Sequence, residues 1–387
     1  GLPPGYRATI EKMCEYQAYL RRPDGNYPPF NASDPNNAQM LVLAGGQFFR
    51  RSDLTYIGRF GKAGTAPTTT SILFRDSGVA VMRDGWGREA NYLAIDAGPY
   101  GVSYQHEDKL GFELAAFGRT VLVDPGRYSL DIGDPITSYL ESTEAHNTIT
   151  IDGGGQMRRQ VRGTWTPEGN DPVDWGSREA FDYFAGVYRS GYETAPGVTH
   201  RRRIFFVKAR PRPYWVVSDR IEGEGSHTIE SRFQFIDGPL ETAGEGSWRT
   251  TGSGGNLALV CPADGTTVSA RIVEGSRQPM GGWVSVAYRK IDPAPQLVLE
   301  REGQLPQTMT VVLAPFEGAS AAPDVSIRAE EGKGSAADRS IVEIDFGDFR
   351  DTVFVDHALK TEERSIAGMK ASGCFVVVRS EGAGSEK

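Results

Sequence analysis

The chain has 387 residues, of which 39% are hydrophobic, and it carries a formal net charge of −8 at pH 7. This length is enough to bury a large core, while the negative charge argues against a general nucleic-acid or anionic-membrane partner. The 47 glycines and 23 prolines, together with frequent β-branched and aromatic residues, favour many short strands joined by tight turns. We therefore expect a mainly β protein.

The cysteines and the apolar runs exclude two further classes. Cys14, Cys261 and Cys374 are widely spaced and odd in number, so they indicate neither a disulfide framework nor a thiolate metal site. No apolar run reaches about 18 residues, which argues against an ordinary membrane-spanning helix. The chain begins at Gly1 without a signal-like stretch, and we expect that processing or truncation has removed the true start.

The first 60 residues have a helical pattern. Apolar residues between Ile10 and Ala18 recur at a spacing of three or four, and the sequence at 23–25 ends that helix. Asp34 as N-cap and Pro35 at the first helical position predict a second helix, and residues 52–53 predict a short third one. So few helices bury too little surface alone. We expect them to pack on the rest of the chain through Ile10, Met13, Leu41 and Phe48.

After a small and polar linker at residues 62–70, the apolar period changes from about 3.6 to 2, which is typical of strands. This change divides the chain into a helical segment, 1–66, and a strand-rich domain, 67–387. Residues 153–196 are less regular and predict an excursion over the sheet face, and 318–338 and 381–387 predict a mobile loop and a frayed tail. The predicted strands are 72–74, 79–83, 92–96, 110–117, 120–123, 148–151, 203–207, 214–219, 229–235, 257–260, 283–288, 309–313, 341–346, 352–355 and 375–378.

Residues 98–110 combine a histidine, two carboxylates, tyrosines and a lysine with glycines, between two predicted strands. His106 in this segment, Asp124 and His146 each stand at a strand or turn end, so all three can converge on one point. Two histidines and a carboxylate are ligands that zinc takes. The alternative is two hydrogen-bonded structural histidines and an aspartate that caps a turn.

Two sequence blocks carry a family resemblance. HEDKLGFELAAFGRTVLVDPGRYS and STEAHNTITIDGGGQMR resemble the C-terminal sandwich of heparinase II/III-type polysaccharide lyases, a superfamily that includes the oligoalginate lyases. The resemblance implies a two-sheet antiparallel super-sandwich, preceded by a short α-helical remnant of an α/α toroid that would lie mostly upstream of Gly1. It also implies that His106, Asp124 and His146 hold a structural zinc ion that ties the site loop to the sheet.

The resemblance implies an activity as well: cleavage of an acidic, uronate-containing polysaccharide, such as a glycosaminoglycan or alginate, by β-elimination. In that reaction one group neutralises the carboxylate, a base removes the C5 proton and an acid protonates the leaving O4. The toroid residues that fill these roles in the family are not identifiable here, so the chain alone is expected to be incomplete. A periplasmic or secreted location and a possible homodimer are further expectations.

Individual site residues follow from the same resemblance. Many family members carry a histidine where this chain has Tyr104, whose phenol could exchange a proton with the sugar or form an aromatic platform. We expect cations near the cleft to bind the substrate carboxylate, because the guanidinium fork suits carboxylate and sulfate. The expected substrate-binding residues are Arg83, Arg127, Tyr128 and Arg158. Three consecutive arginines at 201–203 are expected on the surface.

Two other functions remain open at this point. One is a non-catalytic, zinc-containing β-sandwich that binds glycan or scaffolds a partner, which agrees with the tyrosine at position 104. The other is a sandwich glycosidase or sugar isomerase, which rests on analogy of fold alone. Adjacent carboxylates such as Glu107 and Asp108 would point to opposite faces of a strand, so they do not indicate a glycosidase pair.

Overall fold

A computed structural model describes residues 3–34, 36–100, 105–131, 133–158, 171–208, 212–261, 268–318, 324–329, 339–357 and 361–381. Within these parts of the chain, no helix combines the length and the apolar character needed to cross a membrane. The helices are α1 (Tyr6–Leu20), α2 (Gln39–Phe49), α3 (Ser52–Gly58) and α4 (Pro135–Leu140), with a 3-10 turn, η1 (Thr143–Ala145).

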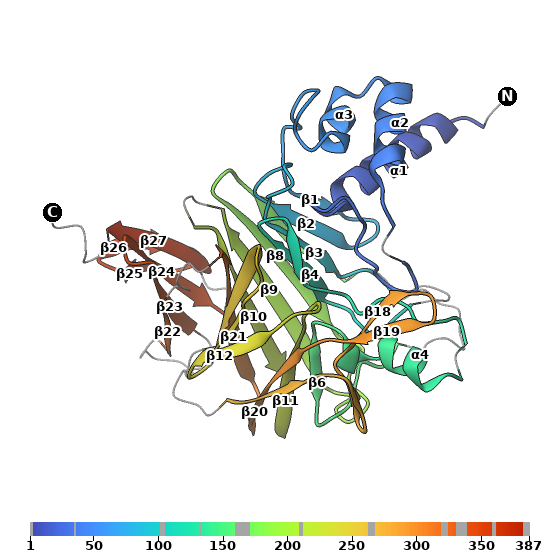
Figure 1. The fold of residues 1–387 in the computed structure, drawn as a ribbon. Coiled ribbons are helices and arrows are strands. Elements are labelled where there is room, and N and C mark those ends of the chain that lie inside the picture. Colours follow the sequence, from blue (N-terminus) through green and yellow to red (C-terminus); the bar gives the residue numbers. More distant parts are fainter. Residues whose placement is uncertain are drawn as a thin grey trace.

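An eight-stranded antiparallel sheet forms the middle of the molecule, in the order β12-β13-β14-β21-β10-β9-β8-β7 (Figure 1). Almost all residues of its inner strands are buried, because other sheets cover both faces of this sheet. The bounds are β7 (Asp174–Ser177), β8 (Phe181–Tyr188), β9 (Thr199–Val207), β10 (Tyr214–Glu222), β12 (Leu240–Gly244), β13 (Ser247–Thr250), β14 (Gly255–Val260) and β21 (Gln307–Glu317).

Two sheets cover one face of this central sheet, and a bridge between Leu122 and Phe235 links them. The first is β1 (Ile72–Phe74), β2 (Val79–Arg83), β3 (Tyr92–Asp96), β4 (Gly111–Ala116) and β5 (Arg119–Leu122), paired in chain order. The second has the order β15 (Ser269–Val273), β20 (Gln296–Gln304), β11 (Ser226–Gln234) and β6 (Ile149–Ile151). The largest hydrophobic core lies here, where the ring of Trp215 stacks on Phe206 with centroids 4.2 Å apart.

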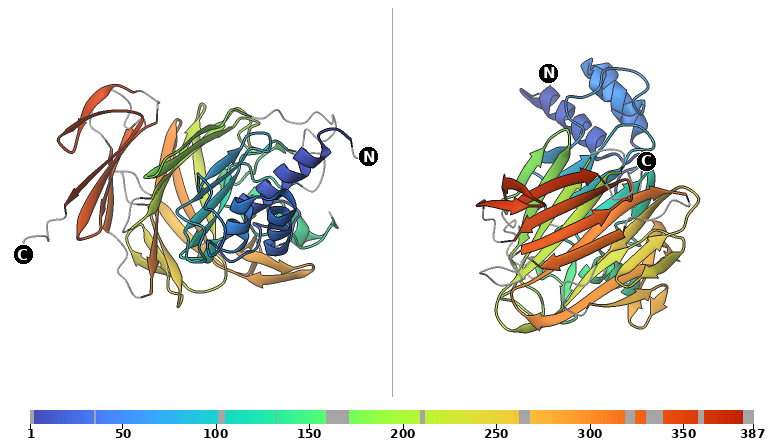
Figure 2. Two further views of the ribbon diagram at one scale, coloured as in Figure 1. Left: turned by 90° about the horizontal axis from the view of Figure 1, so that it is seen from above. Right: turned by 90° about the vertical axis from the view of Figure 1, so that its left-hand side faces the viewer.

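A four-stranded C-terminal sheet covers the opposite face and makes a third layer, as Figure 2 shows from above. Val207 and Val216 of the central sheet meet Val342, Val353 and Val355 in this second core. The strands are β22 (Asp324–Ala329), β23 (Arg339–Asp345), β24 (Phe349–Asp356) and β27 (Phe375–Glu381). Three hairpins complete the described part of the fold: β16 (Ser276–Arg277) with β17 (Met280–Gly281), β18 (Trp283–Ala287) with β19 (Lys290–Pro293), and β25 (Glu363–Ile366) with β26 (Met369–Ser372).

The predicted β-sandwich is confirmed, and every predicted strand overlaps an observed one. Residues 153–196 were predicted to pass over the sheet face, which is wrong for β7 and β8 because these strands extend the central sheet. The strand β22 occupies part of the loop that was predicted at 318–338. The second helix begins at Gln39 instead of directly after Asp34. The side chain of Asn37 accepts a hydrogen bond from the Gln39 amide at 2.9 Å, whereas Asp34 pairs with Arg127.

The helices pack against the sheet of β1–β5, as predicted, but mostly through other residues. Tyr19 lies edge-on to Trp86 with ring centroids 5.0 Å apart and also contacts Phe74, next to buried Leu54 and Ile57. Of the four residues predicted for this contact, only Ile10 packs there. Met13, Leu41 and Phe48 are 61%, 51% and 64% exposed, so the prediction was wrong for these three.

Candidate metal centre

The sheet brings the three predicted ligands together. His106 lies between β3 and β4, and Asp124 follows β5, so antiparallel pairing places both at the same sheet edge. His146 directly follows η1 and precedes β6, which pairs with β11. A hydrogen bond of 3.0 Å from the Val123 amide to the Gln234 carbonyl joins β11 to the segment that carries Asp124. Loops distant in the sequence therefore converge.

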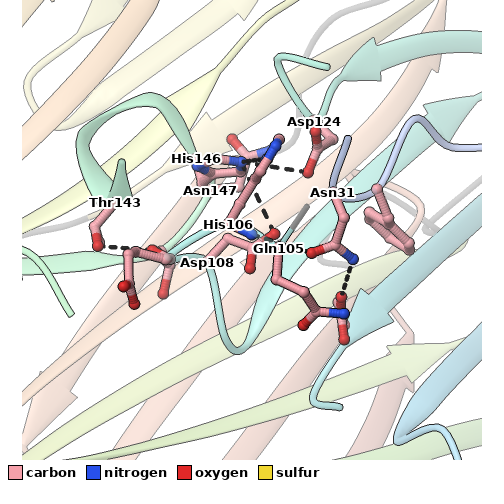
Figure 3. Close-up of polar contacts among 12 residues, drawn as sticks. Asn31, Gln105, His106, Asp108, Asp124, Thr143, His146 and Asn147 are labelled. Atoms are coloured by element: carbon pink, nitrogen blue, oxygen red, sulfur yellow. Dashed lines mark hydrogen bonds and ion pairs between the residues drawn. The ribbon is translucent and has the colours of Figure 1, made fainter. Parts of the chain in front are cut away.

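The donor atoms of the three side chains face one another (Figure 3). Nδ1 of His106 lies 3.2 Å from Nε2 of His146, which lies 3.6 Å from Oδ2 of Asp124. All three residues are buried, and one ligand atom from each lies within 4.8 Å of the others. Ligands of a tetrahedral zinc ion stand about 3.3 Å apart, so the cluster is close to the spacing that zinc needs.

The protonation of His146 also suits a metal ligand. Its Nδ1 lies 2.7 Å from the Ser142 carbonyl oxygen, which only accepts hydrogen bonds, so Nδ1 carries the proton. Nε2 then presents its lone pair to His106 and Asp124, as metal-bound histidines do. Burial, and after it the nearby Asp108, raise the pKa of Asp124 well above its usual range, a cost that a bound cation would offset. The donor set therefore fits zinc.

Arg158 holds the loop that carries His106. Its guanidinium donates hydrogen bonds to the carbonyls of Gly98 at 3.0 Å and His106 at 3.3 Å, and pairs with Asp108 at 3.2 Å. It also lies 5.1 Å from the centre of the Tyr100 ring, and the residue is only 2% exposed. Arg158 was predicted to bind substrate, but these contacts make it a support of the loop that carries His106.

The other predicted substrate residues lie in two places. Arg83 is 3% exposed beneath the helices, where it donates to the carbonyls of Tyr19 and Arg21 at 2.5 and 2.8 Å, and burial lowers its pKa to about 10. It therefore holds the end of α1 and lies outside the metal cluster. Arg127 and Tyr128, by contrast, follow the ligand Asp124 and are partly exposed. Position 104, predicted to be catalytic, lies outside the described residues.

Two residues that support the backbone around the cluster of His106, Asp124 and His146 were missed in the sequence analysis. Asn147 donates to the carbonyls of Phe112 and Val123 at 2.7 and 2.9 Å. Arg202 donates to the carbonyls of Leu110 and Asn147 at 2.8 and 2.6 Å, so one guanidinium joins the segments that carry His106 and His146.

Arg202 was predicted on the surface, but it is fully buried. Asp219 neutralises its charge with contacts of 2.7 and 2.8 Å. Burial alone would raise the pKa of Asp219, but Arg202 and His200 outweigh it and hold that pKa well below its usual range. No spacing in the sequence distinguishes this arginine from its neighbours, because its burial depends on sheets that pair far along the chain.

Comparison with known proteins identifies the family. The family model described as heparinase II/III-like, C-terminal, matches residues 66–328. The chain belongs to this family. A heparin-sulfate lyase from Bacteroides stercoris is 26% identical over 299 residues, which are 74% of this chain and 41% of that protein.

Solved structures share the fold. The crystal structure of a heparan sulfate lyase from Pedobacter heparinus matches with a TM-score of 0.75 and 23% identity, over 92% of this chain and 54% of that one. A heparinase III structure matches with a TM-score of 0.70 and 16% identity, over 98% of this chain and 55% of that one. The chain thus spans about half the length of these relatives, and the resemblance inferred from the sequence is confirmed.

Proposed function

We propose that this chain is the C-terminal part of a polysaccharide lyase that cleaves an acidic, uronate-containing glycan by β-elimination. The observation that carries the proposal is the family match over residues 66–328, within which His106, Asp124 and His146 converge. The relatives are named for heparin and heparan sulfate, which supports a sulfated glycosaminoglycan, ahead of alginate, as the first substrate to test.

In this proposal His106, Asp124 and His146 bind one zinc ion with a structural role. Such an ion would join the loop before β4, the loop after β5 and the turn before β6. Arg158 and Arg202 support the same loops through backbone carbonyls. The metal centre thus fixes the surface on which the glycan lies, and the chemical steps belong to other groups.

β-Elimination moves one proton from C5 to a base, forms a C4=C5 double bond and releases O4, which takes a proton from an acid. The uronate carboxylate must be neutralised for the C5 proton to become acidic. Arg127, which is partly exposed in the loop after Asp124, is the cation that we assign to this carboxylate or to a sulfate, with Tyr128 beside it. Tyr104 is the proton-transfer group that we propose from this chain.

The test uses the intact parent protein, because the proposed cleft has a second wall outside this chain. We expect it to form unsaturated uronate ends, which absorb ultraviolet light, from heparan-type glycans, and the 387-residue chain alone to do so barely or not at all. Replacing Tyr104→Phe removes only the hydroxyl and should lower the rate by roughly a hundredfold or more.

Each outcome has a clear meaning. Near-normal rates of the Y104F variant would leave Tyr104 as a stacking platform and move the proton transfer to other residues. If no uronate polymer yields an unsaturated product, the lyase proposal fails, and a module that binds glycan without cleaving it becomes the better explanation.

A further inference from the structure

The hairpin of β18 and β19 carries an aromatic side chain at its tip that the fold leaves open to solvent. Tyr288 and Arg289 form the two-residue turn between Ala287 and Lys290, and Tyr288 is 51% exposed. Arg289 adopts a left-handed backbone with φ of 59°, a conformation that favours glycine in such turns. The turn is therefore built around two large side chains where small residues are usual.

Backbone hydrogen bonds fasten this hairpin to the loop that follows the metal ligand Asp124. The Ser285 amide donates to the Pro125 carbonyl at 2.8 Å, and the Arg289 amide donates to the Tyr128 carbonyl at 2.7 Å. The Ser285 hydroxyl also donates to the Arg127 carbonyl. The position of the tip thus depends on the same loop that contributes a metal ligand and the proposed carboxylate-binding arginine.

Two guanidinium groups accompany the exposed ring. The Cζ atom of Arg127 lies 5.4 Å from the centre of the Tyr288 ring, and that of Arg289 lies 5.9 Å from it. Both distances are within the range of a cation–π contact. Arg127 also pairs with Asp34, which holds it beside the ring. The half-exposed Tyr288 ring with two guanidinium groups over it suits a sugar unit that carries anionic groups.

We propose that Tyr288, Arg127 and Arg289 form a subsite, here called the tip subsite, that binds one acidic sugar unit of the glycan. The pyranose packs against the part of the Tyr288 ring that stays exposed beside the guanidinium groups, and a sulfate or carboxylate group of that unit takes hydrogen bonds from the arginines. This inference rests on the proposed function, since it assumes an acidic glycan, and it adds Tyr288 and Arg289 as residues that set the preference for charge.

Titration calorimetry of this chain with a heparan sulfate hexasaccharide tests the tip subsite without requiring catalysis. Tyr288→Ala should weaken binding about tenfold, which corresponds to about 1.4 kcal/mol, while Tyr288→Phe should keep the affinity because it keeps the ring. Arg289→Gln should weaken binding about threefold and make it less sensitive to salt. With a desulfated hexasaccharide, Arg289→Gln should have a smaller effect.

A matched control comes from Arg277 on β16 and Trp283 at the start of β18. The Arg277 guanidinium lies 5.1 Å from the Trp283 ring, so Arg277→Gln removes a similar cation–aromatic pair that belongs to no proposed site. Its affinity should stay within about twofold of the wild-type value. Melting curves of all variants show whether each one is folded.

Unchanged binding by folded Tyr288→Ala and Arg289→Gln chains would overturn the tip subsite, as would the absence of any binding by the wild-type chain. These results differ from a failure of the proposed function. If the parent protein cleaves uronate polymers while the variants bind normally, the lyase proposal stands and the tip subsite falls. If the variants lose binding while the parent cleaves nothing, the subsite stands in a protein that binds glycan only.

Discussion

At the residue scale, the five histidines show how much the surroundings decide. His200 pairs with buried Asp219 at 2.8 Å, and His227 with the more exposed Asp152 at 2.7 Å. His106 and His146 instead face each other beside the carboxylate of Asp124 (Figure 3). This arrangement brings two ring nitrogens and a carboxylate oxygen to a common point.

We expect chelator-free protein to contain about one zinc ion per chain, and His146→Ala to reduce this below about a tenth of an equivalent. Removing one of three ligands lowers affinity steeply, and binding free energy of a structural zinc is folding free energy. Elemental analysis measures the metal, and melting curves with and without EDTA measure its contribution to stability.

His227→Ala is the control, because it removes a histidine outside the cluster and should retain the metal. Less than a tenth of an equivalent of any metal in the wild-type protein, with melting unchanged by EDTA, would rule the zinc centre out.

The convergence of His106, Asp124 and His146 could be predicted before the structure because ligand chemistry and the family resemblance pointed to the same residues. The structural roles of the supporting arginines could not be inferred from the sequence. Arg83, Arg158 and Arg202 look like solvent-exposed cations in the sequence, yet each is buried and donates to backbone carbonyls. Their roles depend on which loops the tertiary fold brings within reach, and the pattern of neighbouring residues does not contain that information.

At the element scale, α1 and α2 carry more apolar residues than their contact with the sandwich buries. Cys14, Ala18 and Tyr19 are buried in the cluster that the helices share with Trp86 and Phe74, while Met13 and Phe48 remain mostly exposed. Helical spacing predicts which residues share a face, but when apolar residues surround a helix it does not show which face meets the core. The packing of the helices was therefore predictable, and the contact residues were not.

Tyr19→Ala should destabilise the whole chain by about 3 kcal/mol or more, because it removes a buried ring that contacts Phe74 and Trp86. Met13→Ala, from the exposed side of the same helix, should change the free energy of unfolding by less than about 0.5 kcal/mol. Urea unfolding followed by tryptophan fluorescence measures both. Equal effects of the two substitutions, or a separate transition for the helices, would contradict this docking.

At the scale of the whole molecule, buried polar contacts reinforce the apolar core that joins the C-terminal sheet to the central one. His357 is 2% exposed, and its two ring nitrogens lie 3.1 Å from Ser218 Oγ of β10 and 3.0 Å from Ser340 Oγ of β23. Arg203 of β9 donates to the His357 carbonyl at 3.0 Å. The third layer was missed in the sequence because nothing in a strand pattern reveals how many sheets will stack.

The surroundings of His357 predict how stability depends on pH. Burial, followed by the charges of Arg203 and Arg220, lowers the pKa of His357 to about 3, below the value of about 6.5 expected in the unfolded chain. Below about pH 6.5, His357 is protonated in the unfolded chain but stays neutral in the folded one. The free energy of unfolding therefore falls as the pH drops below this value. At pH 5 this single group should account for a loss of about 2 kcal/mol.

Replacing His357→Gln removes the titration and keeps an amide that can bond to both serines. Between pH 7 and pH 5 the variant should lose about 2 kcal/mol less stability than the wild-type chain. His200, whose pKa burial also lowers, adds the same loss to both proteins. His227→Gln is the control, because hydrogen bonding to Asp152 raises the pKa of His227 and its contribution has the opposite sign. Equal losses in the wild-type and His357→Gln chains, measured by urea unfolding at both pH values, would show that His357 does not govern the acid sensitivity of the layered fold.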